Sequence, residues 1–91
     1  MKLITEQQVK KSVNLSEAFI VIEKSYVDYS SGATITPTTT SMSVNEGNFY
    51  SFPCYISGKK FFISKQASDF RKNKNFGLPS VHPYILVFDY K

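Results

Sequence analysis

The chain has 91 residues, a length at which folding buries only about 60–65% of the unfolded surface, so it can form one small core and not two. It carries 8 Phe and 6 Tyr, a net charge of +4 and a single cysteine, Cys54, which excludes an intrachain disulfide. The apolar run at residues 18–22 is far shorter than the roughly 20 residues of a membrane span. We therefore expect a cytoplasmic protein with no membrane partner, in which some aromatic rings cover an interface.

Two helices are predicted at the N-terminus. Thr5, followed three residues later by Gln8, is a capping box that starts a short helix through about Ser12. Asn14 with Glu17 repeats this signal. The apolar residues that follow recur at helical spacing before Gly32, a natural C-terminal cap; they are Leu15, Ala18, Phe19, Ile22, Tyr26 and Tyr29.

The rest of the chain is predicted to form a meander. The sequence indicates an extended segment at 33–44, strands at 49–56, 60–67 and 84–89, turns at 45–48 and 57–59, and a polar loop at 68–79. Pro53 lacks a ladder donor, which predicts a bulge or a sheet edge there. The continuous apolar run at 85–88 predicts a strand buried on both faces. The fold class is therefore α+β, with two helices followed by a mostly antiparallel sheet in one domain spanning 1–91.

Nothing in the sequence forms a catalytic constellation. His82 is the only histidine, and with Cys54 it cannot supply the three or four ligands of a zinc site, so we expect no metal. A histidine beside a proline is more often a surface or hydrogen-bonded residue. The chain has no GxGxxG or phosphate loop, so we expect no bound cofactor and no catalytic residue in this chain alone.

Lys65 is placed differently from the other lysines. Strand alternation puts it on the face of Phe61 and Ile63, where a charge is costly unless an anion meets it. The alternative interpretation is a lysine whose ammonium reaches out to water.

A basic excess lies at residues 59–74, which hold six basic residues against Asp69 alone. Such a cluster is usually a solvated face. The alternative is a small nucleic-acid-binding module, in which these charges and the neighbouring rings engage a single strand; the rings are Phe61, Phe62, Phe70 and Phe76.

Several strings in the sequence resemble the ornithine cyclodeaminase/mu-crystallin family across essentially the whole chain. The opening residues 3–9 and the helix at 18–32, followed by Pro37, are similar to that family's first elements. The most specific matches are Phe52-Pro53-Cys54-Tyr55, Lys65, Asn73, Gly77-Leu78-Pro79-Ser80-Val81-His82 and Val87-Phe88-Asp89, in that order. The resemblance implies part of a substrate-binding and dimerisation domain.

The resemblance also implies roles for particular residues. Lys65 matches a lysine that contacts the substrate carboxylate, and Ser80, Val81 and His82 match the strand entry near the nicotinamide end of the cofactor. Thr39 replaces a family arginine that would bind the carboxylate in bidentate fashion, which argues against ornithine as the substrate.

The resemblance implies a homodimer, and an enzyme that uses NAD or NADP to act on an amino acid or cyclic imine. Here the chain would supply carboxylate binding and dimerisation, and the Rossmann domain would lie beyond Lys91, so we expect the chain alone to be inactive. Two other functions stay open: the basic nucleic-acid-binding module, although nucleic acid is not the partner we expect, and a non-catalytic dimerisation remnant.

Overall fold

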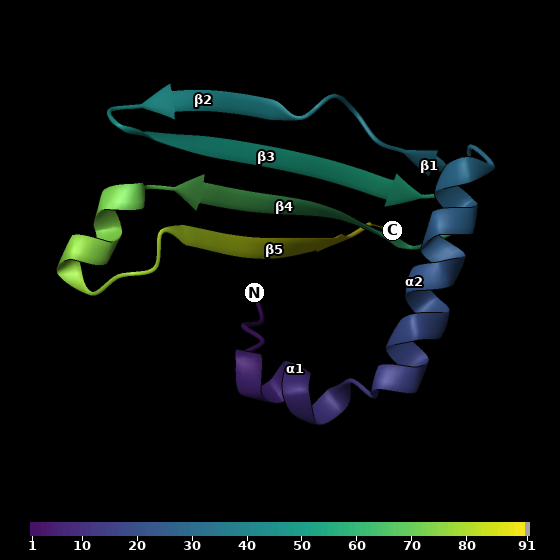
Figure 1. The fold of residues 1–91 in the computed structure, drawn as a ribbon. Helices are drawn as coiled ribbons and strands as arrows, with labels where there is room; N and C mark the ends of the chain where they lie inside the picture. Colours follow the sequence, from purple (N-terminus) through teal and green to yellow (C-terminus); the bar gives the residue numbers. More distant parts are fainter. Residues whose placement is uncertain (91) are drawn as a thin grey trace. The chain divides into compact units, whose positions relative to one another are not determined.

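The computed structural model describes residues 1–90, which divide at Gly32 into an N-terminal helical unit and a sheet unit. The helices are α1 (Glu6–Ser12) and α2 (Leu15–Ser30). The sheet unit holds β1 (Thr34–Ile35), β2 (Thr40–Val44), β3 (Gly47–Ile56), β4 (Phe61–Asp69), the 3₁₀ helix η1 (Arg71–Phe76) and β5 (Val81–Asp89) (Figure 1). This order confirms the predicted α+β fold.

Both helices begin as the sequence predicts. The Thr5 hydroxyl accepts a hydrogen bond from the Gln8 amide at 3.2 Å, and the Gln8 side chain accepts one from the Thr5 amide at 2.8 Å. The Asn14 side chain accepts bonds from the amides of Ser16 and Glu17. These side chains satisfy amides that have no partner within the helix. No helix among residues 1–90 is long and apolar enough to cross a bilayer.

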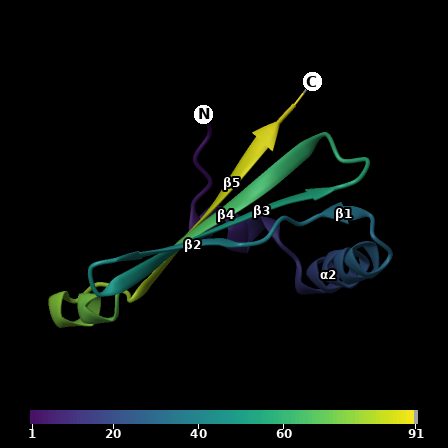
Figure 2. The same ribbon diagram turned by 90° about the horizontal axis from the view of Figure 1, so that it is seen from above.

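The sheet is antiparallel throughout its described pairs. Its order is β1-β3-β4-β5, and β2 pairs with the same strand, β3, that β1 does. Viewed from above, the long strands fan out with a pronounced twist (Figure 2). The two short strands thus share one side of β3, and β5 forms the opposite edge.

Pro53 lies where the ladder on one side of β3 is interrupted. The β1 pairs end at Tyr55 and the β2 pairs end at Ser51, so the residues between them are paired only with β4. This agrees with the predicted edge position, because a proline has no amide to donate.

The segment after β4 differs from the predicted loop. β4 continues to Asp69, and residues 71–76 form η1, which is followed by its C-cap residue Gly77 with φ 72°. The Asn73 amide donates to the Phe70 carbonyl at 3.0 Å, and the Asn73 side chain donates to the Pro79 carbonyl at 3.2 Å. Polar composition indicated the turn but not these local bonds, which make it helical.

β5 begins at Val81, three residues before the predicted start. The Phe70 amide donates to the Ser80 carbonyl and the Tyr90 amide donates to the Lys60 carbonyl, so even-numbered β5 residues turn their backbone groups toward β4. Pro83 is odd-numbered and faces the free edge. Its missing amide therefore costs no ladder bond, and the strand includes it.

The prediction that β5 is buried on both faces is wrong for the described residues. Ile85, Leu86, Val87 and Phe88 are exposed by 65%, 43%, 61% and 42%. The strand has a partner on one side only, and Ala67 is the one buried hydrophobic residue among residues 1–90. The run is continuous because β5 contributes apolar side chains to both faces of the sheet.

Gly47 is required by packing. A Cβ at this position would lie 2.4 Å from the Phe70 ring and 2.7 Å from the Asp69 carbonyl oxygen. We expect Gly47→Ala to lower the free energy of unfolding by about 1–3 kcal/mol, the usual cost of overpacking, in urea titrations followed by circular dichroism. Ser41→Ala, at an exposed strand position, is the control and should change it by about 0.5 kcal/mol or less. Equal effects of the two substitutions would contradict this assignment.

The far end of the sheet is closed by two tyrosines. The hydroxyls of Tyr55 and Tyr90 lie 2.9 Å apart and share a hydrogen bond, and the Lys59 carbonyl oxygen lies 3.2 Å from the Tyr55 hydroxyl and 2.6 Å from the Tyr90 hydroxyl, where it can accept the remaining phenolic hydrogen. The hydrogen bond with Tyr55 raises the pKa of Tyr90 above its ordinary value of 10.0. Since the folded state favours the neutral phenol, this stabilisation is present below about pH 10 and is lost as the pH rises through the raised pKa.

We expect Tyr55→Phe to lower the pKa of Tyr90 toward its ordinary value, because the main cause of the shift is removed. The titration of the Tyr90 Cζ carbon by NMR measures it, with Tyr84→Phe as a control that leaves the Tyr90 midpoint unchanged. An unchanged Tyr90 midpoint in Tyr55→Phe would show that another group causes the shift.

Candidate functional site

The register of the sheet unit places Lys65 at the centre of one face. Lys65 pairs with Phe52 on β3 and with Ile85 on β5. Because successive side chains alternate, the residues of this face can be read from the register. We call this surface the Lys65 face; its residues on the three long strands are 48, 50, 52, 54 and 56, then 61, 63, 65, 67 and 69, then 81, 83, 85, 87 and 89.

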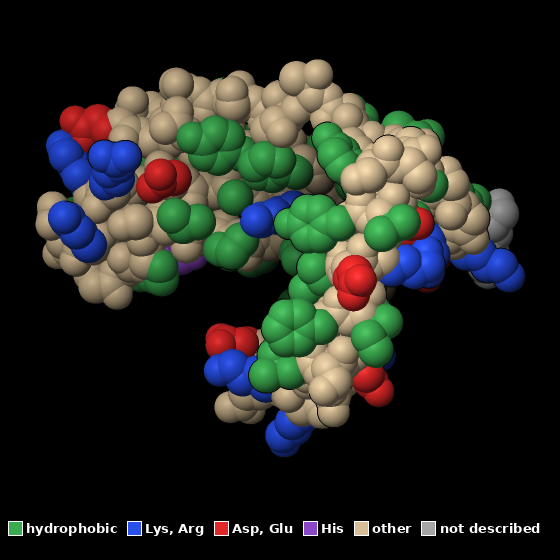
Figure 3. Space-filling model, turned by 45° about the vertical axis from the view of Figure 1, so that its right-hand side comes forward, with side chains coloured by type: hydrophobic (Ala, Val, Ile, Leu, Met, Phe, Trp, Pro, Cys, Tyr) green, Lys and Arg blue, Asp and Glu red, His purple; other side chains and the backbone are tan. Residues whose placement is uncertain are grey.

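The Lys65 face is apolar around its lysine. The nearest residues on β4 are Ile63 and Ala67, as alternation predicts, and the Tyr50 and Phe52 rings stack 6.1 Å apart beside them. Hydrophobic side chains gather over the sheet in the space-filling view (Figure 3). The sequence prediction of a lysine on an apolar face is therefore reproduced by the register.

The Lys65 ammonium is exposed and is held by a ring. Its nitrogen lies 5.8 Å from the centroid of the Phe52 ring, a cation–π distance. The three ion pairs found within residues 1–90 are Lys10–Glu6, Lys24–Asp28 and Lys72–Glu46, so none involves Lys65. A charge over a ring, with no carboxylate paired to it in the described chain, is available to a ligand anion.

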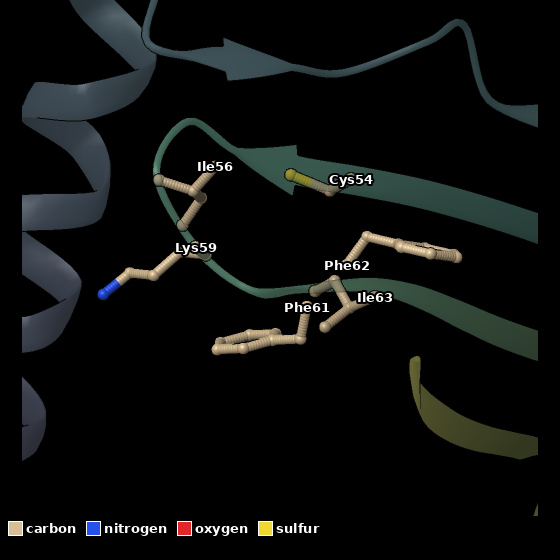
Figure 4. A pocket seen from close by; sticks show the side chains of 6 residues that line it. All are labelled: Cys54, Ile56, Lys59, Phe61, Phe62 and Ile63. Carbon is tan, nitrogen blue, oxygen red and sulfur yellow. The ribbon is translucent and has the colours of Figure 1, made fainter. Parts of the chain in front are cut away.

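A small apolar pocket lies at one end of this face, by the β3–β4 turn (Figure 4). It is lined by Cys54, Ile56, Lys59, Phe61, Phe62 and Ile63. Cys54 is half-buried within it, which agrees with a packed thiol. Lys59 is the one charged residue of this lining and the others are apolar, so the pocket offers packing surface and few polar groups.

The other predicted site residues do not surround Lys65. Thr39 immediately precedes β2, which β3 separates from β4. Val81 pairs with Asp69 and lies on the Lys65 face, four residues along β5 from Ile85. His82 is the next residue, so alternation turns it to the opposite face, where it pairs with Ser68. Ser80 uses its carbonyl to accept the Phe70 amide.

The opposite face, which we call the Phe62 face, carries a polar band that the sequence analysis missed. The Gln66 side-chain amide donates to the Ser51 hydroxyl at 3.0 Å and to the Ser64 hydroxyl at 2.6 Å. Beside the band, Phe62 and Phe88 stack with centroids 5.0 Å apart. Period-two alternation of Ser64 and Gln66 was the signal that could have found it.

The basic cluster at residues 59–74 is divided by the fold. Lys59 and Lys60 lie at the β3–β4 turn, and the other basic residues except Lys65 lie in η1, beyond the nine residues of β4. Nine strand residues span roughly 30 Å. Lys72 is also paired with Glu46. These charges therefore do not form one continuous basic patch, which weakens the nucleic-acid-binding interpretation.

Residues 1–90 do not offer the usual site for a dinucleotide or a metal. Such cofactors bind where a strand passes through a glycine-rich turn into a helix, and no glycine of this chain lies at such a junction. No group of three His, Cys, Asp or Glu side chains in the described chain could hold a metal ion.

Comparisons with known proteins give structural neighbours but no sequence family. No family model matches the chain, and no curated protein sequence matches it. An archaeal alanine dehydrogenase dimer with bound NAD matches with a TM-score of 0.84, at 19% identity over 94% of this chain and 26% of the enzyme.

A second neighbour is the Thermococcus litoralis Δ1-pyrroline-2-carboxylate reductase, solved with NADH and L-proline. It matches with a TM-score of 0.87, at 25% identity over 98% of this chain and 28% of the reductase. The chain thus spans about a quarter of each enzyme's length. Both neighbours are NAD-linked dehydrogenase- or reductase-type enzymes of amino-acid and imino-acid chemistry, and this chain has the fold of one part of them.

Proposed function

We propose that this chain is the substrate-side part of an NAD(P)-dependent enzyme of the ornithine cyclodeaminase/mu-crystallin type, acting on an amino acid or cyclic imine. The observation that supports it most is Lys65, a cation at the centre of an apolar face with no carboxylate paired to it within residues 1–90. The fold shared with two NAD-linked enzymes supports the same conclusion.

In this proposal Lys65 binds the substrate carboxylate. A charge-assisted hydrogen bond from an ammonium to a carboxylate is stronger than a neutral one, and the apolar surroundings strengthen it further. Phe52 acts through Lys65 as a positioning residue, since its ring holds the ammonium from one side. Thr39 offers a hydroxyl where a guanidinium would add a second charge, so Lys65 carries most of the attraction from this chain.

Lys65, Phe52 and Thr39 take no part in hydride transfer in this proposal. A bound NAD or NADP would exchange a hydride with the substrate, and this chain would orient the substrate by its carboxylate. Ser80, Val81 and His82 are proposed to lie near the cofactor; of these, Val81 shares the face of Lys65.

We expect Lys65→Ala to abolish binding of small carboxylates. Acetate titrated into the labelled chain should shift amide signals of β4 and its neighbours Phe52 and Ile85 at millimolar concentration, and the variant should lose these shifts because the cation is gone. Lys74→Ala in η1 removes the same charge elsewhere and should keep them. If the shifts persist in Lys65→Ala, or never occur in the parent chain, the carboxylate site is wrong.

Homodimerisation is the second part of the proposal. The aromatic rings of the Phe62 face are exposed by 41% at Phe62 and 42% at Phe88, and the archaeal neighbour was solved as a dimer. Because a ligand at Lys65 needs its own face open, we assign the dimer contact to the Phe62 face. Stacked rings of this kind are typical of interface cores.

We expect Phe88→Ser to weaken self-association at least about tenfold, since interface aromatics are frequent hot spots. Sedimentation equilibrium of the parent chain and the variant measures this. Val87→Ser, the neighbouring residue on the Lys65 face, is the control. A monomeric parent chain, or equal losses in the two variants, would contradict the assignment.

A further inference from the structure

The charged residues of the strands all lie on one side of the sheet. β1, β2 and β3 carry none, and those of β4 and β5 are Lys65, Asp69 and Asp89, which the register places on the Lys65 face. The alternate residues of these strands form the Phe62 face, which therefore holds no Lys, Arg, Asp or Glu in the described strands. Depletion of charged residues is typical of the buried core of an interface.

His82 is the one residue of the Phe62 face that can gain a charge near neutral pH. It is half-buried and pairs with Ser68 on β4, and its next neighbours on this face are Gln66 and Tyr84. An imidazole gains a proton between about pH 5 and pH 8, a range in which a phenol stays neutral. The charge of this face therefore depends on His82 alone.

No carboxylate of the described chain is placed to pair with a protonated His82. Asp69 pairs with Val81 and so lies on the opposite face. Glu46, at the β2–β3 turn, is paired with Lys72. The η1 segment that follows β4 adds only the cations Arg71, Lys72 and Lys74.

We propose that His82 makes the self-association of this chain pH-dependent, because the dimer takes up its neutral imidazole. This rests on the proposed function, which assigns the dimer contact to the Phe62 face. Apolar side chains are exposed at both ends of that face, by 54% at Met42 in the cross-strand row of His82 and by 42% at Phe88. A partner that covers both ends also removes His82 from water.

The symmetry of a dimer leaves a charged imidazole without a partner. A two-fold contact pairs the same surface from both copies, so the second copy also brings no carboxylate to the Phe62 face. A protonated His82 would lose its hydration there without an anion to replace it. Association is therefore strongest above the titration range of the imidazole and weakens as the pH falls through it.

Sedimentation equilibrium at about pH 7.5 and about pH 5.5 tests this assignment. We expect the dissociation constant of the dimer to rise at least about tenfold at the lower pH, since both copies must release a proton to associate. His82→Gln keeps a neutral polar side chain and should associate equally at both pH values. His82→Lys carries a charge throughout and should associate weakly at both.

A displaced histidine is the matched control. Val81→His combined with His82→Gln moves the imidazole by one residue to the Lys65 face, and the dissociation constant should then be independent of pH. If this variant responds to pH as the parent chain does, the assignment to the Phe62 face is wrong. Circular dichroism at the lower pH checks that each variant is folded.

The same measurements separate this inference from the proposed dimer. A parent dimer whose dissociation constant is the same at both pH values, or changes equally in His82→Gln, would overturn the role of His82 and leave the dimer standing. A parent chain that is monomeric at both pH values would overturn the dimer and the role of His82 together.

Discussion

The unbroken register of β4 between β3 and β5 is the constraint on which the candidate site depends. β4 pairs with β3 over seven residue pairs and with β5 over nine, without a bulge. A shift by one residue would move every side chain of the strand to the other face. Lys65 would then leave Phe52 and Ile85 for the face of Ser51, and Ser64 and Gln66 would move to the opposite face. The function proposed for this chain therefore depends on strand pairing. Pro53 and Pro83 do not disturb this pairing, because each lies at a position whose amide would face away from β4 and where no ladder hydrogen bond is lost.

The sequence predicted those parts of the fold that local chemistry decides. Thr5 with Gln8 and Asn14 with Glu17 cap the two helices because each set of groups lies within one turn. Alternation placed Lys65 with Phe61 and Ile63 for the same reason, since a strand needs only its own residues to set its faces. The sequence failed where the answer depended on other elements. The apolar run of β5 predicted burial on both faces, but such burial requires a layer packed over each face of the sheet, and Ile85, Leu86, Val87 and Phe88 are exposed in the described chain.

The site was predictable in part. The register confirms the face of Lys65, but the separation of Val81 from His82 is visible only once the two residues are placed in β5. Residues that are adjacent in sequence thus lie on opposite faces of the sheet. The basic run at residues 59–74 is also divided, because most of its charges lie at the two ends of β4. The polar band of Ser51, Ser64 and Gln66 shows the converse, because the hydrogen bond from Gln66 to Ser51 joins residues that are distant in sequence and lie on two strands.

The sheet combines a charged centre on one face with stacked rings on the other, and these two features make different demands. A cation on an apolar face adds attraction for an anion and gives little to stability, since an exposed cation–π contact contributes only about 0.5–1 kcal/mol. Covering the stacked Phe62 and Phe88 rings removes apolar surface from water and is favourable, whereas Lys65 must stay accessible to bind an anion. A protein that uses both must bury the Phe62 face and leave the Lys65 face open to its ligand. The small apolar pocket beside Ile63 lies on the face that stays open, which is where the uncharged part of a bound carboxylate would find packing surface.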